Sequence, residues 1–143
     1  MHMMKIGLAV VIALTGSAAG AQDKDDFCGE LRRIMDAARE VPAFASLERA
    51  RPQLGFLGGP CFRFASGVAP GYRCSRNLAP AGFSHESLAA QTRACLPEAV
   101  EVEGASRRTR RFQYDDFDID IGESGADRGH VGRMVSYSVT LRR

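Results

Sequence analysis

The clearest hydrophobic pattern in this sequence lies in its last third, where apolar and polar residues alternate along two runs. The first run, 116–121, alternates aspartates with phenylalanine and isoleucine, and the second, 135–141, alternates valine, tyrosine and leucine with serine and threonine. Strict alternation is typical of a β-strand with one buried face. We therefore expect the two runs to pair as an antiparallel hairpin across a loop from Gly122 to Gly132.

Before the hairpin, apolar residues recur at helical spacing in two segments and at strand spacing in short runs. The predicted elements are a helix from Asp23–Asp26 to Pro42, a short turn at Phe44 and Leu47, strands at Cys61–Ala65 and Tyr72–Arg76, a helix from the N-cap Ser84 to Leu96, and a short strand at Val100 and Val102. Helices on one face of an antiparallel sheet give a two-layer domain. We expect the α+β class, with a sheet of four to five strands and two main helices on one face.

Residues 1–21 have the pattern of a secretory signal peptide. Lys5 supplies the positive start, Ile6–Leu14 is the apolar run, and Ala19–Ala21 provides a small-residue cleavage site. The run is shorter than the roughly 20 apolar residues that a spanning helix needs. We expect cleavage to leave one disulfide-stapled α+β domain, 22–143, in the periplasm or outside the cell.

Composition narrows the class of protein. Charged residues make up 25% and hydrophobic residues 45% of the 143 residues, which indicates a folded domain. The formal net charge of +2 provides no field for non-specific nucleic-acid binding. We therefore expect no nucleic-acid partner, and no transmembrane segment in the mature protein.

The expected exported part contains four cysteines, Cys28, Cys61, Cys74 and Cys95. An even number in an oxidising compartment predicts two disulfides, for which three pairings exist. A zinc site is the alternative, but the chain has no C-x-x-C pair, and spacings of 33, 13 and 21 residues resemble no zinc ribbon or finger. A bridged cysteine holds no thiolate, so we expect no cysteine nucleophile.

The pairing of these cysteines is open between two arrangements. Cys74 shares the apolar side of its strand with Tyr72 and should point at the helices, where Cys95 ends the second one. This favours Cys74–Cys95 together with Cys28–Cys61. The rival arrangement, Cys61–Cys74 with Cys28–Cys95, would cross-link one hairpin directly.

The alternating acids Asp116, Asp118 and Asp120 resemble the opening of a calcium-binding loop. An EF-hand loop needs glycine at its sixth position and glutamate at its twelfth, where this chain has Ile121 and Asp127. The polar face of a strand is the better interpretation. We expect no metal and no cofactor.

Arginines flank the hairpin on both sides. Pairing Ile121 near Gly132 would bring Arg110 close to Arg143 and gather six arginines at one end of the sheet. Arginine forks suit carboxylates and phosphates, so these residues could bind an anion or an acidic partner; a solvated surface is the alternative. The expected interaction surface comprises Arg107, Arg108, Arg110, Arg111, Asp116, Asp118, Asp120, Arg142 and Arg143.

Two histidines, His85 and His130, follow the signal segment. Ser84 beside His85 is better explained as a helix cap than as a nucleophile, because adjacent helical residues do not face one another. The chain contains no G-x-S-x-G motif, and no third group can be assigned to orient a base. We therefore predict no catalytic residue.

Four short motifs carry a resemblance to a known group of proteins. They are Phe27-Cys28 at the start of a helix, Leu57-Gly58-Gly59-Pro60-Cys61 before a strand, Tyr72-x-Cys74, and Ala94-Cys95-Leu96-Pro97 at the end of a helix. The series, from Phe27 to Pro97, resembles small exported bacterial α+β proteins of unassigned function. The resemblance implies structural cysteines and an envelope or secreted module.

These patterns favour an exported, non-catalytic binding or interaction module of the bacterial envelope, with a protein or an anionic small molecule as partner. An inhibitor or immunity-type protein that blocks an enzyme in the envelope is the first alternative. A small hydrolase using His130 or His85 is the second.

Overall fold

The computed structural model describes residues 19–49, 60–67, 69–77, 84–104, 106–125 and 133–142. Its elements are α1 (Ala19–Ala38), α2 (Ala45–Arg49), β1 (Cys61–Ser66), β2 (Ala69–Arg76), α3 (His85–Cys95), β3 (Val100–Val102), β4 (Thr109–Tyr114), β5 (Phe117–Ser124) and β6 (Met134–Leu141). Helices and strands follow one another in the predicted order, with β4 as an addition. Asp118 and Asp120, which could have opened a calcium-binding loop, lie in strand β5.

All six strands form one antiparallel sheet in the order β1-β2-β6-β5-β4-β3. After the β1–β2 hairpin, the chain passes through α3 to the opposite edge and returns strand by strand until β6 lies beside β2. The predicted hairpin of β5 and β6 is confirmed, with Ile121 opposite Tyr137. Both strands continue past the predicted ends, to Ser124 and from Met134, so their connection is shorter than 122–132.

The sheet has six strands, whereas four to five were expected, because the arginine-rich segment TRRFQY forms β4. Phe112 of this strand is fully buried, and Arg111 lies opposite Asp120 of β5. The arginines make the segment look like a charged loop. Their long side chains nevertheless suit a strand, since they reach solvent and carboxylates from a half-buried position.

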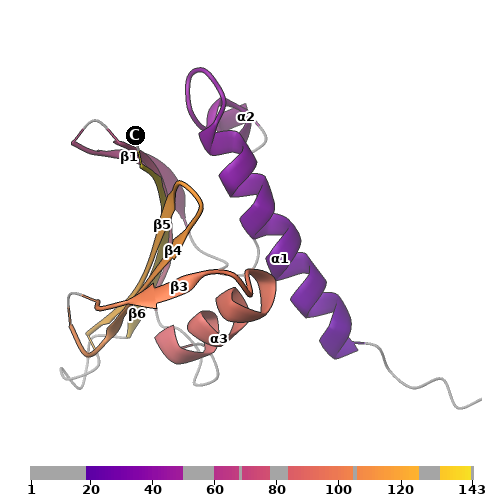
Figure 1. Cartoon of the computed structure of the whole chain (residues 1–143), viewed down its shortest axis with the longest axis vertical. Coiled ribbons are helices and arrows are strands. Elements are labelled where there is room, and N and C mark those ends of the chain that lie inside the picture. Colours follow the sequence, from indigo (N-terminus) through magenta and orange to yellow (C-terminus); the bar gives the residue numbers. More distant parts are fainter. Residues whose placement is uncertain are drawn as a thin grey trace, which may run out of the picture.

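Both long helices lie on the same face of the sheet (Figure 1), as predicted. α1 packs on β2 and β6, and α3 packs on β4 and β5. Alternate strand residues point at these helices and are buried, which makes this layer the core. The main side chains of this core are Phe27, Leu31, Ile34, Leu88, Phe112, Ile119, Ile121, Tyr137 and Val139.

Tyr137 of β6 joins both helices to the sheet. Its ring meets the Phe27 ring of α1 edge-on, with 5.9 Å between the centroids. Its hydroxyl lies 2.8 Å from Thr92 Oγ1 of α3, which itself donates to the Leu88 carbonyl, so Tyr137 donates to Thr92. Complete burial raises the pKa of the Tyr137 hydroxyl and keeps it protonated as this donor.

Ser84 caps α3, as predicted. Its Oγ accepts a hydrogen bond from the Ser87 backbone N–H at 3.1 Å, and Ser87 Oγ accepts one from the Ser84 N–H at 3.0 Å. This is a capping box in which serine occupies the third helical position in place of glutamate. The Ser84 hydroxyl is therefore committed to the helix end.

The four cysteines form two disulfides, Cys28–Cys95 and Cys61–Cys74. The favoured pairing, Cys28–Cys61 with Cys74–Cys95, is wrong, and the rival arrangement is correct. The reason is the register of the first hairpin, which places Cys61 directly opposite Cys74. Cys28 and Cys95 then meet where α1 passes α3. Two disulfides fit an oxidising compartment outside the cytoplasm.

Each disulfide should stabilise the fold according to the length of chain that it closes. Replacing Cys28 and Cys95 with serine should lower the free energy of unfolding by about 4 kcal/mol, because the bond closes 67 residues. Replacing Cys61 and Cys74 should lower it by about 3 kcal/mol, because that bond closes 13. Urea denaturation of both serine variants measures these losses, and recovery of a Cys28–Cys61 peptide on non-reducing mapping would contradict the pairing.

Candidate functional site

The predicted polar side of the hairpin lies on the face of the sheet that no described element covers. We call this side the uncovered sheet face. Asp118 and Asp120 lie on it, half-buried, because the alternate residues Phe117, Ile119 and Ile121 are buried against the helices. The cross-strand neighbours on the same face are Arg73, Arg111, Ser138 and Thr140.

Ion pairs hold the centre of this face. Arg111 Nε lies 2.6 Å from Asp120 Oδ1, and this hydrogen bond raises the pKa of the Arg111 guanidinium. Arg142 Nε lies 3.5 Å from Asp118 Oδ1. Asp116 lies at the β4–β5 turn instead, where its carbonyl accepts a hydrogen bond from the Arg142 backbone. Two pairs of the predicted surface, Arg111–Asp120 and Arg142–Asp118, therefore bind each other.

The arginines do not gather at one end of the sheet, so this prediction is wrong. The offset between β5 and β6 is the reason: Phe117 lies opposite Leu141, which brings Arg142 to the Asp116 end of β5. Arg108 lies at the other end, where its carbonyl accepts a hydrogen bond from the Glu123 backbone. Arg107 precedes Arg108 at that end, and Arg143 lies outside the described residues.

Arg110 also departs from the predicted surface. It lies opposite Ile121 and therefore on the helix side of the sheet. There its Nη1 is 2.9 Å from Glu101 Oε1, while Arg93 of α3 binds the second oxygen of the same carboxylate. These hydrogen bonds lower the pKa of Glu101, with the bond to Arg93 the largest cause.

An aromatic platform at the β1 edge of the uncovered sheet face was not predicted. The Phe64 ring lies over Gly71, where a Cβ would approach ring atoms to within 2.4–2.8 Å. The Arg73 guanidinium lies over the same ring, 4.9 Å from its centroid. Alternation along β1 indicates that Phe62 and Phe64 share a face, but it does not show that this face is the exposed one.

A second unpredicted group lies near the start of α3. His85 Nδ1 is 2.7 Å from Glu123 Oε2, and Arg133 Nη1 is 3.1 Å from Glu123 Oε1. The side chains of His85 and Glu123 are only 11% and 8% exposed. Glu123 occupies the helix-facing row of β5 after three apolar residues, and a carboxylate in such a row signals a buried partner.

The Glu123 carboxylate orients the His85 imidazole, as a carboxylate does in many proton-transfer sites. Among the described residues, however, no hydroxyl or thiol forms a hydrogen bond with His85. The nearby Ser84 and Ser87 hydroxyls belong to the cap of α3. His130 lies outside the described residues. The group therefore supplies a positioned histidine without an assigned nucleophile.

The described part of the chain contains no group of three histidine, cysteine or acidic side chains arranged to hold a metal ion. None of its helices combines the length and the hydropathy that a membrane span requires.

The His85–Glu123 pair should contribute to stability, because removing His85 leaves Glu123 Oε2 buried without its hydrogen bond, although Arg133 still pairs with Glu123 Oε1. His85→Ala should lower the free energy of unfolding by about 1–3 kcal/mol. In the double variant His85→Ala/Glu123→Ala, the loss should be smaller than the sum of the single losses by about 1–2 kcal/mol. Urea denaturation of the four species measures this coupling.

Glu86→Ala is the matched control, because Glu86 is the exposed neighbour of His85 on the first turn of α3. It should cost less than about 1 kcal/mol. Additive losses for His85 and Glu123 would mean that the two side chains do not interact.

Known proteins provide no further guide to the function of this site. The chain matches no family model, no curated protein and no solved structure. Its similarity to small exported four-cysteine proteins therefore remains an expectation from sequence.

Proposed function

We propose that this protein is an exported, non-catalytic binding module of the bacterial envelope that holds a protein partner on its uncovered sheet face. The observation that carries this proposal is an exposed aromatic cluster at the β1 edge of that face: Phe62 is 48% exposed, lies opposite Arg73 and shares its side of β1 with Phe64. Antiparallel sheets commonly turn one face to water, but that face is usually polar. Clustered exposed apolar groups are typical of interaction sites.

The side chains on this face are those that protein interfaces favour. Aromatic residues, methionine and arginine are enriched in interfaces, and the face presents Phe62, Phe64, Met134 and Arg73. The Phe64 ring is already held between Gly71 and Arg73, so little side-chain freedom is lost on binding. This rigidity supports a protein partner with an apolar contact surface.

The predicted leader and the two disulfides support the export part of the proposal. Disulfides form and persist in the periplasm and outside the cell. Both bonds brace the sheet and helices, and neither leaves a thiolate for catalysis among the described cysteines.

Changes on the uncovered sheet face should weaken partner binding. Phe62→Ser removes an exposed aromatic group, and Arg73→Glu reverses the charge above Phe64. Each should raise the Kd for a partner co-purified from native envelope extract by at least about tenfold, as loss of an interface anchor does. Interferometry with the immobilised protein measures the Kd.

Val41→Ser is the control, because Val41 is 99% exposed but lies on the α1–α2 connection, away from the sheet face. It should leave the Kd unchanged. If Phe62→Ser and Arg73→Glu bind the partner as tightly as the unaltered protein, the sheet face is not the interface.

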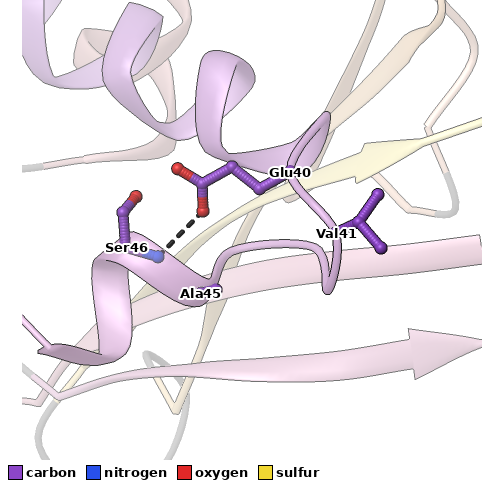
Figure 2. A pocket seen from close by; sticks show the side chains of 4 residues that line it. All are labelled: Glu40, Val41, Ala45 and Ser46. Carbon is purple, nitrogen blue, oxygen red and sulfur yellow. Dashed lines mark hydrogen bonds between the residues drawn. The ribbon is translucent and has the colours of Figure 1, made fainter.

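The α1–α2 connection favours a second candidate function, that of an inhibitor of an envelope enzyme. The segment is held at both sides: the Phe44 N–H donates to the Ala37 carbonyl at 2.7 Å, and the Ser46 N–H donates to Glu40 Oε2 at 2.8 Å (Figure 2). The Phe44 ring is buried near Tyr72. Between these anchors the Val41 side chain points away from the protein (Figure 2), as a group that enters an apolar enzyme pocket would.

The two candidates predict opposite responses to the same variants. For an inhibitor, Val41→Asp should weaken inhibition of the target hydrolase by about tenfold or more, because a charge enters the apolar contact. Phe62→Ser should then leave inhibition unchanged. Enzyme assays against envelope hydrolases, with both variants in parallel, distinguish the two functions, and equal inhibition by Val41→Asp would exclude this loop as the inhibitory segment.

A further inference from the structure

The helix side of the molecule contains a pocket of about 320 Å³, bounded by α1, the C-terminal end of α3 and the β4–β5 turn. We call it the helix-side pocket. Its volume lies at the lower end of the range for small-molecule sites, about 300–1,000 Å³. It lies on the opposite side of the sheet from the uncovered sheet face. An inference about this pocket therefore does not depend on the proposed protein partner.

One stripe of α1 forms a wall of the pocket. Arg32, Met35, Asp36 and Arg39 line it and follow the spacing i, i+3, i+4 and i+7, which places them on one side of the helix. Cys95 lines it from α3. Because Cys95 is bonded to Cys28 of α1, the two walls are covalently joined.

The floor of the pocket is apolar and well packed. Met35, Leu96 and Phe117 line it and are only 7%, 5% and 2% exposed. Arg39 covers the Phe117 ring, with its guanidinium carbon 5.1 Å from the ring centroid. These three side chains are already covered, so the apolar surface that a ligand can reach in the pocket is mainly that of Tyr114, which is half-buried and also lines it.

The charges on the rim differ in whether they already have a partner. Arg39 is committed, since its Nη2 is 2.9 Å from Asp115 and its Nη1 is 3.5 Å from Asp116. Arg32 and Asp36 are exposed, and neither side chain has an ion pair or hydrogen bond within the described part of the chain. The pocket thus offers one guanidinium and one carboxylate that remain available.

This pair of charges selects the class of ligand. A purely anionic molecule would gain from Arg32 what it loses to Asp36, and a cation would meet the reverse balance. A ligand that carries both charges satisfies both residues. We propose that the helix-side pocket binds an apolar α-amino acid, with its carboxylate at Arg32, its ammonium at Asp36 and its side chain against Tyr114, above the floor of Met35 and Leu96.

Titration of the disulfide-bonded protein with L-leucine and L-phenylalanine, followed by NMR, tests this assignment. Saturable shift changes are expected at Tyr114 and at the floor residues Met35 and Leu96. 3-Phenylpropionate lacks the ammonium and phenethylamine lacks the carboxylate, so each should bind at least about tenfold more weakly than phenylalanine. Absence of saturable shifts with both amino acids would overturn the proposal. Equal binding of phenylalanine and the two analogues would also overturn it, because the charges would then play no part.

Variants at the exposed rim separate the two charges without disturbing the core. Arg32→Gln should weaken binding of phenylalanine by about tenfold and abolish its advantage over phenethylamine, and Asp36→Asn should do the same relative to 3-phenylpropionate. Arg33→Gln is the matched control, since Arg33 is exposed on α1 and does not line the pocket.

Phe62→Ser should leave amino-acid binding unchanged, and Arg32→Gln should leave capture of the protein partner unchanged. Each proposal can therefore fail without the other. An equal loss of amino-acid binding in Arg33→Gln and Arg32→Gln would overturn the assignment of the carboxylate to Arg32.

Discussion

The structure depends on one junction, where α1, α3 and β6 meet at Tyr137. The ring of this residue packs edge-on against Phe27, and its hydroxyl donates to Thr92. A buried hydroxyl without a partner would cost about 1–3 kcal/mol, so α3 must remain where Thr92 can accept. The Cys28–Cys95 bond follows directly beside Phe27 on α1 and one helical turn after Thr92 on α3. Packing, hydrogen bonding and covalent chemistry thus fix the same relative placement of the helices.

Because of this placement, the two sides of the sheet offer different kinds of surface for binding. The helices cover the apolar rows of the strands, and a hollow remains between α1, the end of α3 and the β4–β5 turn, which is the helix-side pocket. The other side carries no helix, and its charges are neutralised by their neighbours, as Arg111 is by Asp120. Its exposed side chains include the apolar Phe62, Val100 and Met134 together with Arg73. A small pocket and a sheet face open to solvent follow from the same arrangement of two helices on six strands.

Periodicity predicted the elements well where side chains on the two faces differ in polarity, as in β5 and β6. It failed for β4, because Arg110 and Arg111 point to opposite faces and both find carboxylates. The disulfide pairing depended on which strand residues lie opposite each other, a property of the hairpin turn that the pattern of Cys61 and Cys74 alone does not determine. The sequence did not predict the partner of His85, because Glu123 lies 38 residues later in the chain. Long-range pairing therefore accounts for most of what the sequence left open.

The contact between Phe64 and Gly71 has a consequence for how this chain can vary. Because any side chain at position 71 would occupy the space of the Phe64 ring, the two positions are coupled across the β1–β2 hairpin. In homologues, a larger residue at 71 should accompany a small residue at 64, and Arg73 should then lose its stacking partner. Co-substitution at these three positions would thus be the evolutionary signature of a platform maintained as one unit.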